Sequence, residues 1–175
     1  MNESKLDVKK RAVIEIAENL FLSQGLATTE MKEIARCASI SRSTLYRMFD
    51  SRETLAFAVA DKCLHELFDP KPMEIYGTDR SGFEILRSYS SNLIETMIQG
   101  VRYVKYLSEF DQMFSGDYPD TPEARKYVQF NRQRHDRQIL LNILRLGTED
   151  GSIRGDIDAN MLELTIGNTL LGDNG

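Results

Sequence analysis

Hydrophobic residues along the chain recur at the spacing of α-helices, and no stretch alternates as a β-strand does. In the first segment the apolar side chains fall at i, i+3, i+4, i+7 and i+8, on one face of a helix: Val13, Ile16, Ala17, Leu20 and Phe21. Gly25 follows and predicts the end of that helix, because glycine favours the position that closes a helix. The chain is therefore expected to be all-α.

Two short helices joined by a tight turn are expected next. Thr29 predicts the N-cap of the first, which ends near Cys37, and Ser41 predicts the N-cap of the second, which ends near Met48. Their shared apolar side is Ile34, Ala35, Ala38, Ile40, Leu45 and Phe49. This arrangement is typical of a helix-turn-helix, in which the second helix presents its N-terminal residues to the major groove of DNA.

The side chains at the start of that second helix suit contacts with DNA. The polar residues there are Ser41, Arg42, Ser43, Thr44, Tyr46 and Arg47. Arginine pairs bidentately with guanine, and hydroxyls meet bases or phosphates. We expect Tyr46 and Arg47 to hold the DNA backbone. The alternative is that Tyr46 is a core aromatic residue and that the Arg- and Ser-bearing face is only a solvated surface.

A fourth helix is expected over residues 51–68. Asp50 and Glu53 have the D-x-x-E spacing of a capping box, and Arg52 beside the helix N-terminus suits a phosphate. Two prolines then break the helical pattern, so residues 69–78 are the best candidate for a domain boundary or hinge. Further helical patterns follow at 80–99, 101–114, 120–146 and 157–171.

These motifs form one run with fixed spacing. Its residues are Gly25, Thr29, Met31, Ile34, Ala35, Ala38, Ile40, Ser41, Thr44, Leu45, Tyr46, Phe49, Ser51, Arg52, Glu53 and Leu55. The run resembles the DNA-binding domain of the tetracycline-repressor (TetR) family, over roughly residues 10–60. The resemblance implies an all-helical homodimer with a three-helix DNA-binding domain and a divergent C-terminal domain that binds a small molecule and dimerises. Thr29 and Arg52 complete the predicted set of DNA-contacting residues.

Four positions depart from the family's usual pattern. Ser39 stands where the family has glycine in the turn, a position that can require a positive φ. Ser43 replaces a common glycine and adds a side chain facing DNA, and Glu30 places an acid where a small hydroxyl lies near a phosphate. Asp50, in place of the usual proline, is expected to cap the fourth helix equally well.

The expected domains are a helix-turn-helix DNA-binding domain at residues 1–50 and a helical effector-binding and dimerisation domain at 51–175. Helix 51–68 connects the two. An aromatic stripe at helical spacing over 101–114 suits a pocket for an apolar or aromatic effector. The candidate pocket residues are Tyr89, Met97, Tyr103, Tyr106, Phe110 and Met113. The alternative is that this stripe is plain core.

Charge is divided unevenly between these parts. The 175 residues carry a net charge of −5, which argues against binding polyanions over the whole surface. Residues 1–62 nevertheless hold ten Lys and Arg against nine Asp and Glu, and residues 36–52 hold four arginines against a single acid. A local positive surface for DNA therefore remains, and the acidic excess belongs to the second part.

Other chemistries find little support in the sequence. The N-terminus lacks the apolar stretch of a secretory signal, and no apolar run approaches the ~20 residues that span a bilayer, so a cytoplasmic protein without a membrane segment is expected. Cys37 and Cys63 form no disulfide framework or cysteine-based zinc module, and the spacing of His65 and His135, seventy residues apart, is not that of a metal site. Catalytic and cofactor-binding motifs are absent. We expect no enzyme activity, no metal and no cofactor.

The sequence leaves two hypotheses of different classes. The first is a homodimeric repressor that binds a pseudo-palindromic double-stranded operator and is released by a small-molecule effector. The second is a ligand-binding or protein-interaction module, or a co-activator, whose helix-turn-helix does not bind DNA independently; Glu30 and the overall acidity support it. Residues 172–175 are expected to lead into a further dimerisation helix; the alternative is that helices 120–146 and 157–171 supply the dimer interface themselves.

Overall fold

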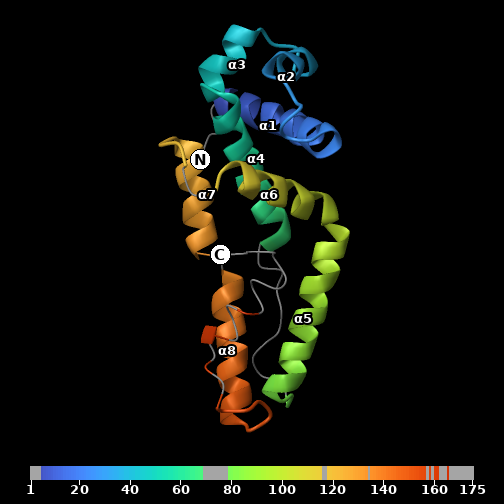
Figure 1. Ribbon diagram of the computed structural model, residues 1–175, viewed down its shortest axis with the longest axis vertical. Coiled ribbons are helices and arrows are strands. Elements are labelled where there is room, and N and C mark those ends of the chain that lie inside the picture. Colours follow the sequence, from blue (N-terminus) through green and yellow to red (C-terminus); the bar gives the residue numbers. More distant parts are fainter. Residues whose placement is uncertain are drawn as a thin grey trace. The chain divides into compact units, whose positions relative to one another are not determined.

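The computed structural model describes residues 5–68, 79–115, 118–133 and 135–156, with 158, 160, 161 and 165. They form the helices α1 (Lys5–Gln24), α2 (Met31–Cys37), α3 (Arg42–Phe49), α4 (Arg52–Phe68), α5 (Gly82–Gln99), α6 (Val101–Met113), α7 (Pro122–Gln133) and α8 (His135–Glu149) (Figure 1). The described residues contain no strand, so the predicted all-α class is confirmed. None of these helices is long and apolar enough to cross a membrane.

The chain divides into two compact units. Unit 1 comprises residues 1–66 and 102–132, and unit 2 comprises residues 67–101 and 133–175. Unit 1 therefore adds α6 and α7 to the first four helices. The predicted boundary at residue 50 separates a DNA-binding domain from an effector-binding domain. It is a division by function, and it stays a prediction. The predicted hinge at residues 69–78 lies outside the described residues.

The core of unit 1 joins helices that are distant in the sequence. On α1 the predicted apolar stripe is buried at Val13, Ala17 and Phe21. Phe57 of α4 packs edge-on against Phe110 of α6, with ring centroids 4.8 Å apart. The aromatic cluster around this pair is completed by Phe114, Tyr118 and Tyr127. These rings, each with a large apolar area, attach α6 and α7 to α4.

A charged pair ties α1 to α4 inside unit 1. Glu18, with 5% of its surface exposed, pairs with the ammonium group of Lys62. Burial on its own lowers the pKa of Lys62, but the hydrogen bond and the negative charge of Glu18 outweigh it and raise the pKa. Lys62 therefore stays protonated at neutral pH, and Glu18 is compensated rather than left as an isolated buried charge.

Unit 2 contains α5 and α8, which pack side by side through Ile85 and Ile143 (Figure 1). Ser81 and Glu84 form a capping box at the start of α5. The turn after α8 adds a second cap, because a carboxylate oxygen of Asp150 accepts a hydrogen bond of 2.6 Å from the backbone N–H of Gly82. The N-terminus of α5 is thus held by its own sequence and by the end of α8.

Two expected helices of the second half need comment. The pattern predicted over 120–146 is matched by α7, which ends at Gln133, and α8, which begins at His135; residue 134 lies outside the described residues. The predicted helix at 157–171 falls mostly outside the described residues, as does the tail at 172–175.

Candidate nucleic-acid interface

The turn between α2 and α3 depends on a serine with a positive φ. Ser39 has φ 53°, and the Ile40 N–H donates to the carbonyl of Ala35 at 3.0 Å to close the turn. This φ is sterically easy for glycine and costly for other residues. The expectation of a positive φ at Ser39 is confirmed. The serine adopts a left-handed backbone conformation that is unfavourable for residues other than glycine.

The short helix α3 has one buried face and one face that is open to solvent. Leu45 and Phe49 are buried almost completely, as expected from the sequence. Ala38 and Ile40, also expected to be buried, are only half-buried. The exposed residues of α3 are Arg42, Ser43, Tyr46 and Arg47. Tyr46 is 46% exposed and is therefore not a core aromatic residue.

Three hydroxyl groups order the N-terminus of α3. Ser41 is the N-cap, as predicted, and its Oγ accepts a hydrogen bond of 3.1 Å from the backbone N–H of Thr44. The same Oγ lies 2.9 Å from the Oγ of Ser43 and 2.8 Å from the Oγ1 of Thr44. The cap stabilises the helix end, and the network holds the polar groups at the point where a recognition helix meets base edges.

The start of α2 differs from the prediction by one residue. Glu30 is the N-cap and makes no side-chain capping bond, while Thr29 is fully buried and its hydroxyl donates to the carbonyl of Gly25 at 2.8 Å. Thr29 thus secures the preceding loop instead of capping α2. Glu30 pairs with Lys32 at 2.6 Å, and the hydrogen bond and charge of Lys32 lower the pKa of the exposed Glu30 carboxyl.

The predicted capping box at Asp50 and Glu53 is wrong. The cap of α4 is Ser51, whose Oγ accepts a hydrogen bond of 3.1 Å from the N–H of Thr54. Asp50 instead follows α3 with φ 50°, a conformation that the fixed φ of proline excludes. Asp50 therefore does not replace the family's proline as an equivalent cap, because the backbone passes through a different conformation here.

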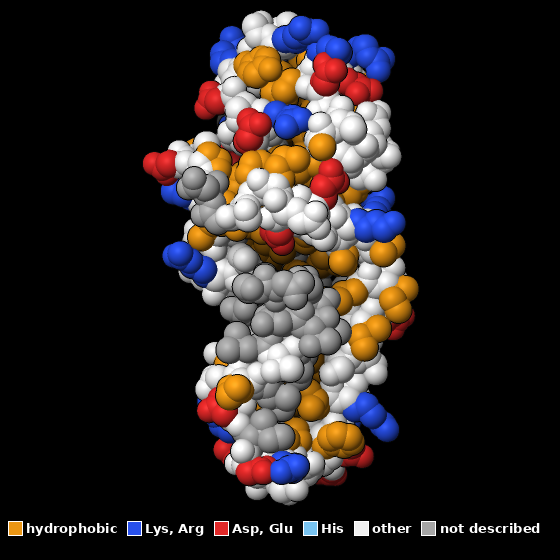
Figure 2. Space-filling view, in the orientation of Figure 1, with side chains coloured by type: hydrophobic (Ala, Val, Ile, Leu, Met, Phe, Trp, Pro, Cys, Tyr) orange, Lys and Arg blue, Asp and Glu red, His pale blue; other side chains and the backbone are white. Residues whose placement is uncertain are grey.

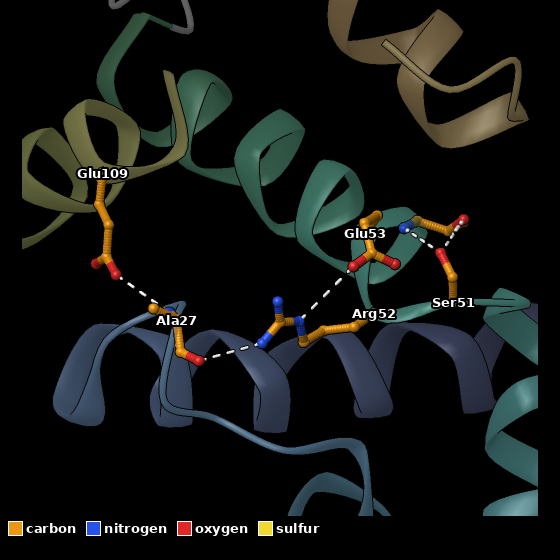
Figure 3. Close-up of polar contacts among 6 residues, drawn as sticks. Ala27, Ser51, Arg52, Glu53 and Glu109 are labelled. Carbon is orange, nitrogen blue, oxygen red and sulfur yellow. Dashed lines mark hydrogen bonds and ion pairs between the residues drawn. The ribbon is translucent and has the colours of Figure 1, made fainter. Parts of the chain in front are cut away.

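Arg52 begins α4 and points toward the loop that precedes α2 (Figure 3). Its Nη1 donates to the carbonyl of Ala27 at 3.2 Å, and its Nε lies 3.9 Å from Oε1 of Glu53. On the other side of this loop the N–H of Ala27 donates to Oε1 of Glu109 on α6, also at 3.2 Å. The guanidinium predicted to meet a phosphate thus has partners within the protein.

An open hollow of about 470 Å³ lies at the meeting point of α2, α3 and the start of α4. Four of the eight predicted DNA-contacting residues line it, namely Thr29, Arg42, Tyr46 and Arg52. The other lining residues are Glu30, Met31, Lys32, Asp50, Ser51 and Glu53. Figure 2 shows Lys and Arg side chains gathered at the end of unit 1 that α2 and α3 form, with acidic side chains next to them.

The candidate effector-pocket residues are distributed over both units. Tyr89 and Met97 lie on α5, whereas the other four lie on α6. Within unit 1, Tyr106 and Phe110 are buried in the core: Tyr106 stacks on Phe21 of α1, and its hydroxyl donates to the carbonyl of Ala56 at 2.9 Å. The remaining two, Tyr103 and Met113, are half-buried and exposed, respectively.

Two features near the hollow were not found from the sequence. Lys32 lines the hollow, and its only sequence signal is a basic residue two positions after Glu30. Glu109 contacts Ala27, in the loop between α1 and α2, from 82 residues further along the chain, and no local pattern indicates that contact.

Comparisons with known proteins agree with this geometry. Residues 13–59 match the family described as "Bacterial regulatory proteins, tetR family". A relative, the HTH-type transcriptional repressor KstR2 of Rhodococcus jostii, is 28% identical over 157 residues, which cover 87% of this chain and 72% of the relative.

Similar folds occur among solved structures. The TetR-family regulator PfmR of Thermus thermophilus aligns with a TM-score of 0.67 at 20% identity, covering 93% of this chain and 86% of PfmR. The ketosteroid transcriptional regulator KstR2 of Mycobacterium tuberculosis aligns with a TM-score of 0.58 at 20% identity, covering 98% and 82%. With the helix-turn-helix of α2 and α3, the match over residues 13–59 shows that the chain carries the DNA-binding segment of the TetR family of bacterial regulatory proteins, and the solved structures share its all-helical fold.

Proposed function

We propose that this chain is a homodimeric transcriptional repressor that binds a pseudo-palindromic operator through α3. The observation that carries this proposal is the two-sided character of α3, which buries Leu45 and Phe49 and exposes Arg42 and Tyr46. Arg42 and Ser43 would meet base edges, while Tyr46 and Arg47 would hold phosphates. Ser41 and Thr44 would order the helix end, and Thr29 would support the loop beside it.

Replacing the exposed side chains of α3 tests the DNA-contacting set. Arg42→Ala and Tyr46→Ala are each expected to weaken operator binding by ~10-fold or more, since each removes a base or phosphate contact. The measurement is a gel-shift titration at fixed salt with the DNA upstream of the protein's own gene. The matched control is Arg145→Ala on α8, which removes one exposed positive charge outside unit 1 and should leave affinity unchanged.

Circular dichroism should give the same helicity for all three variants, because the three side chains are exposed. If Arg42→Ala and Tyr46→Ala both bind the operator with wild-type affinity, the assignment of α3 as the recognition helix is wrong.

The effector is proposed to be an apolar or aromatic small molecule. The supply of aromatic and thioether side chains on α5 and α6 supports this class, as does the description of one structural neighbour as a ketosteroid regulator. Glu30 is the local feature that favours the alternative, a helix-turn-helix that does not bind DNA independently. Because Lys32 pairs with Glu30, that acid is a weaker obstacle to a phosphate than its sequence position implies.

A further inference from the structure

The backbone of Ala27 is held from two sides by side chains of other helices. Its N–H donates to Glu109 of α6, and its carbonyl accepts from Arg52 of α4, each at 3.2 Å (Figure 3). The methyl side chain of Ala27 is exposed. The contact therefore depends only on the backbone of this residue, where three segments distant in the sequence meet.

The loop that contains Ala27 leads directly into α2. Leu26 and Thr29, on either side of Ala27, are fully buried. Helix α2 packs on α1 and on α3. A change in the position of Ala27 therefore displaces α2, and α3 with it, because packed helices move together rather than deform.

The two side chains that hold this loop differ in what their charge alone would do near DNA. Arg52 is positive and, as predicted from the sequence, would attract a phosphate. Glu109 is negative and would oppose DNA binding if it acted only through its charge. Both side chains support the same loop, but their charges have opposite effects on DNA binding. An experiment can therefore separate the structural role of each residue from its electrostatic role.

We propose that Glu109 and Arg52 are positioning residues for DNA binding, which together hold the Ala27 loop so that α3 is presented in its binding orientation. This proposal rests on the proposed function, since it concerns affinity for the operator. It makes α6 a direct support of the helix-turn-helix, through a hydrogen bond to the backbone of the loop between α1 and α2.

Substitutions of Glu109 test the proposal by the sign of their effect. Glu109→Ala removes the acceptor of the Ala27 N–H and is expected to weaken operator binding by ~5–20-fold. Glu109→Gln keeps an oxygen acceptor and should retain wild-type affinity or exceed it slightly. The charge-matched control is Glu149→Ala at the end of α8 in unit 2, which should leave affinity unchanged or slightly increased.

If Glu109 acted only through its charge, both Glu109 variants would bind the operator more tightly than the wild type. Equal or tighter binding by Glu109→Ala therefore overturns the proposal. Fluorescence anisotropy with a labelled operator measures these affinities.

The salt dependence of binding separates the two roles of Arg52. A lost phosphate contact lowers the slope of log K against log salt by about 0.9, whereas a lost positioning contact weakens binding at an unchanged slope. Arg52→Ala is expected to weaken binding with the wild-type slope, and Arg47→Ala, which removes a proposed phosphate contact, to lower it. A reduced slope for Arg52→Ala overturns its positioning role.

A measurement without DNA keeps this proposal distinct from the proposed function. Hydrogen exchange of peptides covering residues 26–49 should be faster in Glu109→Ala and Arg52→Ala than in the wild type, and unchanged in Glu109→Gln. Unaltered exchange in both alanine variants overturns the proposal. Failure of the wild type to bind any upstream DNA contradicts the operator function, while faster exchange would still support the link between α6 and the loop.

Discussion

Cys63 and Cys37 are the clearest example of how position in the fold changes the chemistry of a residue. Cys63 on α4 is fully buried, and burial, with the nearby charge of Glu18, raises the pKa of its thiol to about 12. Cys37 is exposed at the end of α2. Because the thiolate is the reactive form, only Cys37 combines a free thiol with access to reagents.

We therefore expect alkylation of one cysteine in the native protein. At neutral pH iodoacetamide should modify Cys37 rapidly and Cys63 only when the protein unfolds, which peptide mass spectrometry over time resolves. Denaturant should make the two rates similar and serves as the control. Comparable native rates at both sites would contradict the burial of Cys63.

At the same scale, the sequence predicted some caps correctly and others not. Ser41 is the N-cap of α3 and Ser39 has the positive φ expected of its position. The caps of α2 and α4 are each one residue later than predicted, at Glu30 and Ser51. Asp50 and Ser51 are both good caps, whereas Glu30 makes no capping bond, so side-chain preference alone does not decide where these two helices begin.

At the scale of elements, the contact between α5 and α8 requires glycine. A Cβ added to Gly82 would lie 2.2 Å from the backbone nitrogen of Gly147 and 2.3 Å from its Cα. Backbone atoms cannot move aside as a flexible side chain does, so the two helix ends would have to separate. This contact lies next to the capping bond between Gly82 and Asp150.

Gly82→Ala is therefore expected to destabilise the packing of α5 on α8 by about 1–3 kcal/mol. Chemical denaturation of the full chain, followed by circular dichroism, measures the loss. Gly155→Ala is the matched control, because its added Cβ would come within 3.3 Å only of the methyl group of Thr148. Equal stability of the two variants would show that the helix ends separate at little cost.

At the scale of the whole molecule, charge is divided unevenly along the chain. The part with a slight positive excess contains α2 and α3, and the acidic excess lies beyond residue 62. Negative charge outside the proposed DNA-contacting face lowers the affinity for DNA as a general polyanion. Specific contacts through α3 would then contribute more to operator selection than charge does.

A dimer with two recognition helices should protect two half-sites. We expect a hydroxyl-radical footprint with half-site centres about one helical turn apart, ~34–36 Å, or a multiple of it. Sedimentation of the free protein should give twice the 20.0 kDa of one chain. A monomer that protects a single half-site would contradict the homodimeric arrangement, and protection unaffected by any apolar ligand in a panel would contradict release by such an effector.

The sequence by itself determined the all-α class, most helix positions in the first part and the face of α3 that is exposed. Those features follow from periodicity and local chemistry, which act over one or two helical turns. Only the tertiary structure decided that α6 supports the Ala27 loop, that Tyr106 and Phe110 belong to the core of unit 1, and that Arg52 has partners within the protein. The hydrogen bond between Ala27 and Glu109 joins residues 82 positions apart, and the formation of such contacts depends on how helices pack rather than on any local pattern.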